Sequence, residues 1–515
     1  MTIRISRRTM LQTTAAAGLL STIGLPAMAG AKHGGRLRLG LAGANTSDTW
    51  DSRTHSDNYM INMGAGCVFE TLTEVASDGS LRGELAESWD ATPDAKIWTF
   101  TLRKGVKFHN GKSFGADDVI ESMQMHVAEG AKSAAKPIVA SVAEMKKLSD
   151  SQVQFTLKSG SADFPYLVSD YHICMFPAGM VAEAISKGIG TGPYQVVSFE
   201  PGVRTLVKKF EDHYRADTVG YFAEVEAIAI ADASARMNAM MTGQVDAVNR
   251  VDFKTVPLMK ANPNVEIIEV TGNMHNVFPM LCKMDPFKDV NVRKALKYAV
   301  NRQEMVDKIL LGHGAVGNDH PIGPANQYYA ADLPQTSYDP DKAKHYLKKA
   351  GMSNLKLDLH VSEGAFAGAT DAGQLYSNSA AKCGININVI QEPADGYWSN
   401  VWMKKPWCAS YWSGRATEDW MFQTAYESGQ PWNEAGWENE RFQSLLKQGR
   451  SELDTKKRRT IYTEMQSLCS QEGGTVIPMY QNYLDAVSTK LAHGPKVGNL
   501  WMLDNSRISK RWWFA

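Results

Sequence analysis

The sequence is poor in cysteine and has no excess of either charge. Six cysteines are spread over 515 residues, and no two form a C-x-x-C pair. They are too few to act as the scaffold of such a chain; one or two disulfides, or buried free thiols, would each explain them. Lysine plus arginine and aspartate plus glutamate both total 55. This balance gives no electrostatic reason to expect nucleic acid or an anionic membrane as a partner.

Common catalytic motifs are also missing. The sequence contains neither G-x-S-x-G nor H-E-x-x-H, which removes two frequent hydrolase devices. Residues 312–317 match G-x-G-x-x-G, but they follow a predicted helix, whereas a dinucleotide site needs a strand before this motif. His313 and His320 have no common metal-ligand spacing, so solvated loop histidines explain them better. We therefore expect no enzyme, no catalytic residue, no cofactor and no metal site.

The first 29 residues have the composition of an export signal. Three arginines occur without an acidic residue, a mildly apolar stretch covers 13–25, and Ala27-Met28-Ala29 supplies small residues for cleavage. Residues 6–11, Ser-Arg-Arg-Thr-Met-Leu, resemble the twin-arginine motif. A membrane anchor is the alternative, but the apolar stretch is too short and too polar to span a bilayer. We expect a signal peptide over 1–29 and a periplasmic product exported by the twin-arginine route.

The length of the chain favours two lobes, because single hydrophobic cores stop growing beyond roughly 250–300 residues. Strand-like runs at 97–102, 153–157 and 225–230 predict β elements of a first lobe. Residues 355–390 read as strand, helix and strand, a βαβ unit typical of a second α/β lobe. Between these regions lies a predicted helix pair, with Asp289 or Asn291 as the first N-cap and Asn301 with Glu304 as a capping box that starts the second helix.

A series of short strings, in order along nearly 400 residues, resembles the peptide/nickel-type (family 5) extracellular solute-binding proteins of ABC importers, in particular dipeptide- and oligopeptide-binding proteins. The strings include Leu85-Ala86-Glu87-Ser88-Trp89, the run from Trp98 to Lys112, Gly190-Thr191-Gly192-Pro193-Tyr194, Gly243-Gln244-Val245-Asp246-Ala247, Val292-Arg293-Lys294-Ala295-Leu296, Tyr338-Asp339-Pro340-Asp341 and Ile477-Pro478-Met479-Tyr480. Each string is weak alone, and their order makes the resemblance specific.

The resemblance implies an α/β, two-lobed type II periplasmic binding protein fold with mixed sheets and a hinge, in which an extra subdomain enlarges lobe I. Lobe I and its subdomain would span 30–272, lobe II 273–477, and 478–515 would return to lobe I. The chain would cross between lobes near 272–276 and 478–480. A ligand would lie between the lobes, hinge closure would favour the bound form, and ABC permease subunits in the inner membrane would recognise it. We expect a monomer with no nucleic-acid partner.

The same resemblance indicates residues for the ligand's charged groups. Peptide-binding members carry an acidic segment after a Trp-x-Gly strand end, and its last acid meets the ligand's ammonium group. The matching stretch runs from Trp412 to Trp420, one residue shorter and without proline, and Asp419, next to Glu418, aligns best with that acid. Arg415 has no counterpart and offers a forked donor suited to a carboxylate. The alternative is an ion pair within the loop between Arg415 and Glu418 or Asp419.

Aromatic residues are concentrated in the same region: seven of the thirteen tryptophans lie between 398 and 437. Rings there could stack on sugar or apolar faces or hold an alkylated ammonium group, although core packing would account for roughly half of them. The candidate ligand residues are Asp419, Arg415, Glu418, Trp412, Trp420, Trp398 and Tyr397, together with His275 at the first crossing and His55, Asp57 and Asn58 in a loop that resembles the ligand-facing segment of lobe I.

The predicted function is capture of a small solute, a short peptide or an amino-acid-derived zwitterion or cation, for an ABC importer. An oligosaccharide or opine-like ligand stacked on tryptophan is the alternative within the same class. A nickel or haem carrier and a periplasmic hydrolase are the less favoured possibilities.

Overall fold

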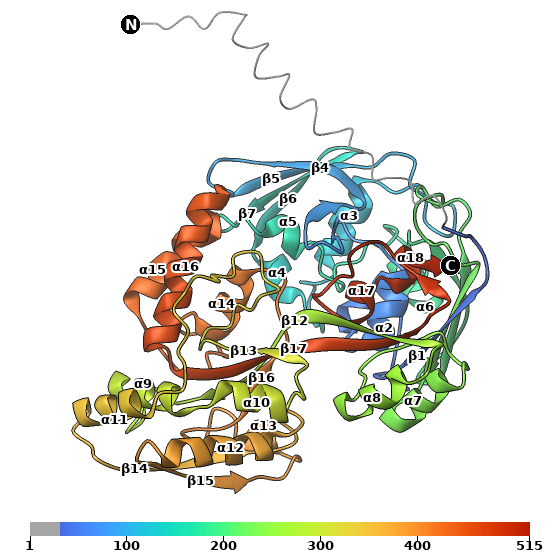
Figure 1. The fold of residues 1–515 in the computed structure, drawn as a ribbon. Helices are drawn as coiled ribbons and strands as arrows, with labels where there is room; N and C mark the ends of the chain where they lie inside the picture. Colours follow the sequence, from blue (N-terminus) through green and yellow to red (C-terminus); the bar gives the residue numbers. More distant parts are fainter. Residues whose placement is uncertain (1–30) are drawn as a thin grey trace, which may run out of the picture.

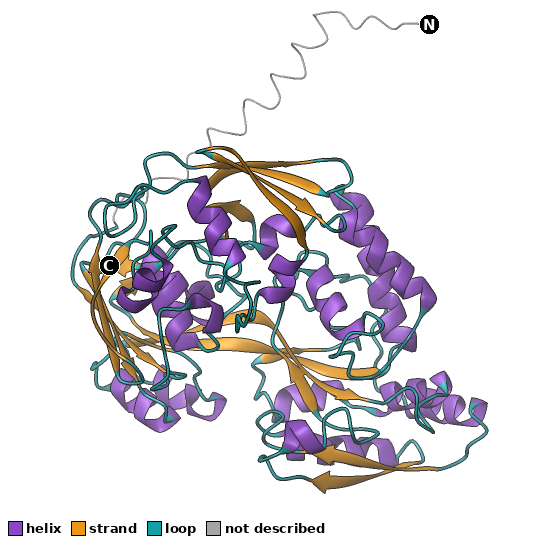
Figure 2. Ribbon diagram, turned by 180° about the vertical axis from the view of Figure 1, so that it is seen from behind, coloured by secondary structure: helices purple, strands orange, loops and turns teal. Residues whose placement is uncertain are grey.

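The structure is a computed structural model that describes residues 31–515; the predicted signal peptide lies outside the described residues. Its central element is a nine-stranded mixed sheet with the order β16-β12-β17-β11-β1-β10-β9-β8 and with β13 beside β17. Figures 1 and 2 show this sheet running across the molecule. Its strands are β1 (Arg36–Leu41), β8 (Tyr194–Glu200), β9 (Arg204–Lys209), β10 (Glu224–Ala229), β11 (Ala247–Val248), β12 (Val265–Pro279), β13 (Gly314–Val316), β16 (Ser410–Trp412) and β17 (Thr475–Ser488).

The buried apolar residues divide the described chain into two lobes. Three clusters contain buried residues from the segments 37–268 and 486–512, whereas two others contain only residues between 277 and 479. The change from one set to the other falls within β12 and again within β17. The α/β, two-lobed fold expected from the sequence is therefore present.

β12 and β17 are the only strands of the described chain that belong to both lobes, and they pair antiparallel along their lengths. In lobe I, Val265–Val270 pair with Tyr483–Ser488, and β11 lies on the other side of β17. In lobe II, Met274–Pro279 pair with the first half of β17, and β13 and β16 extend the sheet. The register shifts between Val270 and Met274. The segments expected to carry the chain between lobes lie in these two strands, so we call this part of β12 and β17 the hinge.

Lobe I is built on the β1 end of the sheet, where β1 pairs in parallel with β10 and β11. A buried ion pair between Lys510 Nζ and Glu84 Oε1, at 2.8 Å, ties the C-terminal segment to this lobe. Its other elements are η1 (Ser52–Thr54), α2 (Asn58–Met63), η2 (Gly64–Val68), β2 (Thr73–Val75), β3 (Leu81–Gly83), α6 (Val181–Lys187), α7 (Ala233–Met241), η3 (Phe253–Thr255), α8 (Val256–Lys260), β18 (Leu491–Ala492), α17 (Met502–Ser506), α18 (Ile508–Arg511) and β19 (Trp513–Phe514).

An extra subdomain extends lobe I and appears in blue and cyan at the top of Figure 1. It is an antiparallel sheet, β4-β5-β7-β6, with a hydrophobic cluster of its own. Alternate buried positions in Ile97–Leu102 and Gln152–Leu157 face this cluster, which is the pattern that predicted strands there. Its elements are β4 (Ala86–Ala91), β5 (Ile97–Leu102), α3 (Ala116–Gln124), α4 (Lys136–Ala140), β6 (Val142–Ser149), β7 (Gln152–Leu157) and α5 (Phe164–Leu167).

Lobe II contains the predicted βαβ unit and the predicted helix pair. β14 (Leu355–Val361) and β15 (Ile385–Gln391) pair in parallel, and α12 (Ala369–Ala381) connects them. Asp289 caps α9 (Val290–Ala299), and Asn301 caps α10 (Arg302–Lys308). The remaining helices are α11 (Pro340–Lys349), α13 (Tyr397–Asn400), α14 (Glu418–Tyr426), α15 (Glu440–Ser451) and α16 (Thr455–Glu472).

The structure also shows the state of the cysteines and tests the described chain for membrane-spanning helices. All six cysteines are free, and all except Cys282 are buried, which matches the alternative of buried thiols. Between residues 31 and 515, no helix is both long and apolar enough to cross a bilayer.

Candidate ligand site

Arg415 occupies the loop between β16 and α14, where two tryptophan rings hold its side chain. Its guanidinium carbon lies 5.8 Å from the centroid of the Trp412 ring and 5.7 Å from that of the Trp420 ring. The hydrogen bonds of the guanidinium go from one nitrogen to the backbone carbonyls of Ser413 and Gly414. Burial lowers the pKa of Arg415, an effect that Tyr171, Asp170 and Tyr483 oppose.

No acidic side chain within the described range 31–515 forms an ion pair with Arg415. The two acids that the sequence offered as partners are engaged elsewhere. Asp419 contacts Nε of Arg450 on α15 at 3.2 Å, and Glu418 accepts a hydrogen bond of 2.7 Å from the backbone N–H of Tyr328. The loop ion pair considered from the sequence is therefore absent. Burial raises the pKa of Glu418 to about 7 and also raises that of Asp419, where it outweighs the opposing charge of Arg450.

Tyr171 of lobe I lies within the electrostatic influence of Arg415. Burial raises the pKa of the Tyr171 phenol, Asp170 and Asp57 raise it further, and Arg415 opposes the rise. The Tyr171 ring packs edge-to-face on Trp501, with centroids 5.3 Å apart. The neighbouring residue, Asp170, accepts a hydrogen bond from Nδ1 of His172 at 2.6 Å. The charge of Arg415 in lobe II thus acts on the Tyr171 phenol of lobe I.

The Arg415 loop rests directly on the hinge. Asn273 of β12 donates its Nδ2–H to the carbonyl oxygen of Arg415 at 3.3 Å, and its Oδ1 accepts from the Tyr483 hydroxyl of β17 at 3.3 Å. His275, two residues further along β12, pairs in register with Trp412. Its ring is fully buried, its Nδ1 lies 3.2 Å from the carbonyl oxygen of Asn273, and its Nε2 has no hydrogen-bond partner among the described residues. Burial lowers the pKa of His275 to about 4, so this ring is neutral at neutral pH.

The aromatic candidates divide between this site and the core of lobe II. Tyr397 is buried and donates its hydroxyl to the carbonyl oxygens of His360 and Ala409, which is a structural role. Trp398 is 41% exposed and packs edge-to-face on Tyr411 and Trp402, without contact to Arg415. Of the predicted rings, Trp412 and Trp420 are those that contact Arg415.

The predicted loop of lobe I, residues 55–58, is hydrogen-bonded to the segment that carries Tyr171. The backbone carbonyl of His55 accepts a hydrogen bond from Nε2 of His172 at 2.7 Å, which links this loop to the segment that carries Tyr171. Asp57 caps α2 through the N–H of Asn58 and pairs with Arg250 at 2.5 Å. Its side chain remains 29% exposed. Tyr171, Tyr483 and Trp501 were not identified from the sequence, because no local motif marks them. Only the fold places Tyr171 and Tyr483 near Arg415 and packs Trp501 on Tyr171.

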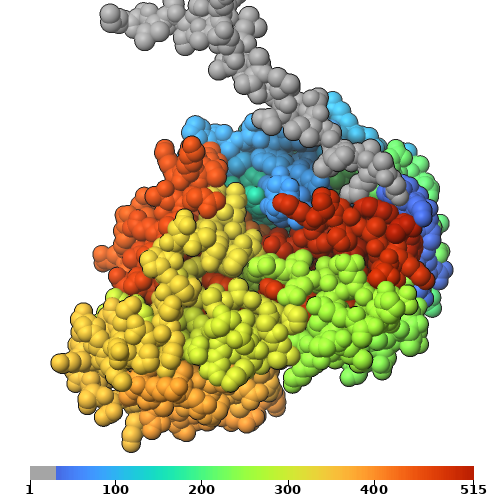
Figure 3. Space-filling view, viewed as in Figure 1, coloured from blue at the N-terminus to red at the C-terminus, as the bar shows by residue number. Residues whose placement is uncertain are grey.

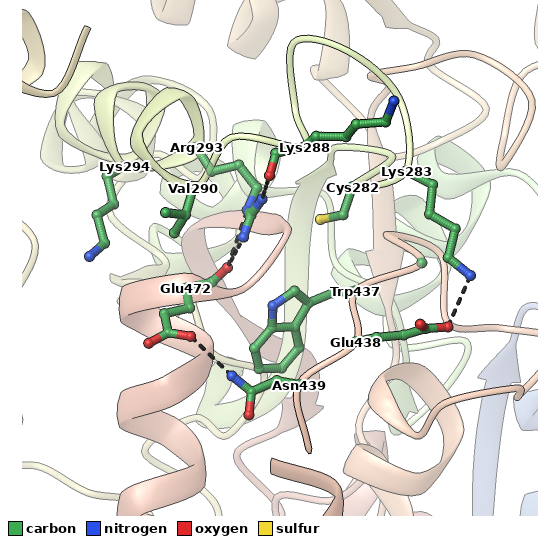
Figure 4. Close-up of a pocket in the computed structure, with 11 residues that line it drawn as sticks. Cys282, Lys283, Lys288, Val290, Arg293, Lys294, Trp437, Glu438, Asn439 and Glu472 are labelled. Atoms are coloured by element: carbon green, nitrogen blue, oxygen red, sulfur yellow. Dashed lines mark hydrogen bonds and ion pairs between the residues drawn. The ribbon is translucent and has the colours of Figure 1, made fainter. Parts of the chain in front are cut away.

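A separate pocket lies on the side of lobe II (Figure 4), between the start of α9 and the end of α16. Its charged groups already interact within the lobe. Arg293 donates to the carbonyl oxygen of Glu472 at 2.7 Å, and Lys283 pairs with Glu438 at 2.9 Å. The region around Arg415, at the boundary between the lobes, is therefore the candidate ligand site.

Comparisons with known proteins show the family and support the fold. The family model for bacterial extracellular solute-binding proteins, family 5 Middle, matches residues 80–434. The dipeptide-binding protein of Escherichia coli (strain K12) is 26% identical over 453 residues, covering 78% of this chain and 81% of the relative. Two solved structures share the fold: HbpA2 from Haemophilus parasuis (TM-score 0.80, 19% identity, 89% of this chain and 96% of that chain) and AgaA of A. tumefaciens in complex with agropinic acid (TM-score 0.75, 22% identity, 93% and 99%).

Proposed function

Because the chain belongs to the family 5 bacterial extracellular solute-binding proteins, we propose that it is the periplasmic substrate-binding component of an ABC importer and captures a small carboxylate-bearing solute between its lobes. Ligand contacts from both lobes would favour the closed form, which a permease then recognises. The protein would act as a monomer, bind its solute without chemical change and reach the periplasm through its N-terminal signal.

The observation that carries this proposal is the guanidinium of Arg415 without a counter-ion. A partly buried charge is costly unless it is paired, so this position is favourable when a ligand supplies the anion. Trp412 and Trp420 lie against the guanidinium and leave N–H groups at its edge without a protein acceptor. A carboxylate matches that edge, because its two oxygens accept parallel hydrogen bonds in one plane.

A positive group on the ligand would find an acid on the opposite lobe. Asp57 is partly exposed, and its carboxylate acts on the same Tyr171 phenol as Arg415 does. Its partner Arg250 has a 44% exposed side chain, and exposed ion pairs are weak enough to rearrange. Asp419 is the less suitable acid because Arg450 already contacts it. A zwitterion, such as a short peptide or an amino-acid derivative, therefore fits the site better than a simple cation.

An opine-like ligand is the second candidate. Opines also carry carboxylates, and the similar fold of AgaA holds agropinic acid. Both classes of ligand would place a carboxylate on Arg415, and they differ in the rest of the molecule. Native mass spectrometry of the purified protein would identify a solute that copurifies.

The test is a thermal-shift and calorimetry panel of dipeptides, amino acids and opines, each compared with its carboxyl amide. We expect some acids to stabilise the protein and their amides to fail. Arg415→Gln should weaken binding of a responding acid by about ten- to hundredfold, the scale of charge-assisted hydrogen bonds. Arg441→Gln is the matched control, because this arginine pairs with Glu464 on the surface of lobe II. Equal binding of acids and amides would contradict the proposal.

A further inference from the structure

The extra subdomain of lobe I touches lobe II through the segment 160–163, which leads from β7 to α5. The backbone N–H of Ala162 donates to the carbonyl oxygen of Arg450, at the end of α15, at 2.7 Å. Asp163 Oδ1 pairs with a guanidinium nitrogen of Arg458 on α16 at 2.6 Å. The two side chains are 3% and 7% exposed, so this ion pair is buried on both sides.

These contacts join parts of the molecule that a hinge movement would separate. Segment 160–163 precedes β12 and belongs to lobe I, whereas α15 and α16 lie between the two hinge strands in the chain and belong to lobe II. Figure 3 shows the orange-red α15 and α16 beside the blue subdomain, and Figure 1 shows the same arrangement as ribbons. Rotation of lobe II about the hinge would part Asp163 from Arg458. The described structure therefore has the lobes in contact at this point.

Helix α14 connects this contact to Arg415. Asp419 in its first turn binds the side chain of Arg450, and the backbone carbonyl oxygen of Arg450 accepts the hydrogen bond from the Ala162 N–H. The next residue, Trp420, lies against the Arg415 guanidinium and also packs on the hydrophobic cluster of the extra subdomain. The Trp420 ring is thus supported from lobe I while it positions a side chain of lobe II.

We propose that the extra subdomain takes part in ligand capture: Asp163 clasps Arg458 when the lobes close, and Trp420, held against the subdomain, then positions Arg415 for the ligand. The role of Trp420 rests on the proposed function, whereas the clasp of Asp163 and Arg458 concerns the shape of the protein alone. Trp420 is a positioning residue in this scheme, and Arg415 is the group that contacts the ligand.

Burial makes the clasp sensitive to substitution. Loss of one partner leaves the other charge buried without compensation in the closed form, whereas water would solvate it in an open form. Asp163→Asn should therefore shift the closed-to-open ratio by at least about tenfold toward the open form. Arg458→Lys keeps the charge but loses the fork, so it should shift the ratio in the same direction by less.

Small-angle X-ray scattering of the full mature chain tests the clasp. Asp163→Asn and Arg458→Lys should increase the radius of gyration, and the double variant should add little to the larger single effect. Arg441→Gln should leave the curve unchanged, because its exposed pair with Glu464 joins α15 to α16 inside lobe II. Circular dichroism checks that each variant is folded. If Asp163→Asn does not fold, the scattering curve of Arg458→Lys alone tests the proposal. Wild-type curves for both clasp variants would overturn the proposal.

The role of Trp420 has its own readout. Trp420→Leu keeps an apolar side chain against the subdomain but removes the ring, so the scattering curve should match that of the wild type. The preference for a panel acid over its amide should fall by about two- to thirtyfold, the range of one cation–π contact. An unchanged preference for the acid would overturn the proposed role of Trp420. If wild-type protein shows no acid preference while the clasp variants still open, the carboxylate proposal fails and the clasp stands.

Discussion

The side chain of Asn273 fills the space that a Cβ atom on Gly414 would need. An added Cβ would lie 1.7 Å from the amide carbon and from Oδ1 of Asn273. Asn273 belongs to hinge strand β12, and Gly414 precedes Arg415. The absence of a side chain at position 414 therefore lets the Arg415 loop lie directly on the hinge, where Asn273 also binds the carbonyl oxygen of Arg415.

We expect Gly414→Ala to lower the free energy of unfolding by about 1–3 kcal/mol, because the new methyl group must displace Asn273 or the loop. Urea unfolding measures the effect. Asn273→Ala removes the clashing atoms, so the double variant should cost less than the sum of the single changes. Additive costs would show that the two residues do not compete for this space.

Glu434 holds two tryptophans at once. Its Oε1 accepts from Trp412 Nε1 at 2.7 Å, and its Oε2 accepts from Trp402 Nε1 at 2.6 Å. Glu434→Gln has nearly the same shape but only one acceptor, so its amide group would face one indole N–H as donor against donor. We expect a loss of about 1–3 kcal/mol in the free energy of unfolding, measured in urea.

A second substitution checks this reason. Trp402→Phe removes one of the two indole donors, so Glu434→Gln should cost less in that background than in the wild type. An equal cost in both backgrounds would exclude the conflict between donors as the cause.

Substitution of Asp419 distinguishes a structural role of this residue from a role in ligand binding. We expect Asp419→Ala to lower the free energy of unfolding by about 1–3 kcal/mol, because Arg450 loses a buried partner. Glu427, 3.4 Å from Arg450, limits the loss. The preference for acids over amides should remain, since it depends on Arg415. A variant of wild-type stability that no longer binds the responding acid would make Asp419 the ligand's partner.

Local patterns predicted much of the fold. The strands at 97–102 and 153–157, the βαβ unit of 355–390 and the caps at Asp289 and Asn301 all depend on residues close together in sequence, and all are present. Such elements follow from alternation, helical spacing and side-chain capping, which act over a few residues.

The candidate site was less predictable because its contacts join distant segments. Arg415 was identified from the sequence, yet neither of the acids considered as its ion-pair partner, Glu418 or Asp419, pairs with it. Asp419 instead meets Arg450, which is 31 residues further along the chain and on another helix. Tyr397, taken as a ligand residue, is buried by contacts within lobe II. The influence of Arg415 on Tyr171 depends on the arrangement of the two lobes, which no local pattern encodes.

Asp485 of β17 should make stability depend on pH. Its Oδ2 accepts the N–H of Leu503 at 2.5 Å, whereas its Oδ1 is buried without a partner in the described chain. Burial raises the pKa of Asp485 from 3.8 to about 7, and the nearby Asp504 adds to the rise. The folded protein therefore binds a proton that the unfolded chain releases between about pH 4 and pH 7. This contribution to stability is present at low pH and is lost as the pH rises through 7.

Comparing the wild type with Asp485→Asn separates the effect of Asp485 on stability from that of the buried histidines. Their lowered pKa values change stability with pH in the opposite direction at acidic pH. The asparagine stays neutral and keeps an oxygen for the Leu503 N–H. We expect the stability of the variant relative to wild type to increase by about 1–3 kcal/mol between pH 5 and pH 8, since one pKa unit corresponds to about 1.4 kcal/mol. Urea unfolding at each pH measures it, with the exposed-loop variant Asp332→Asn as control. A difference that stays constant with pH would mean that Asp485 is already charged in the folded protein at pH 5.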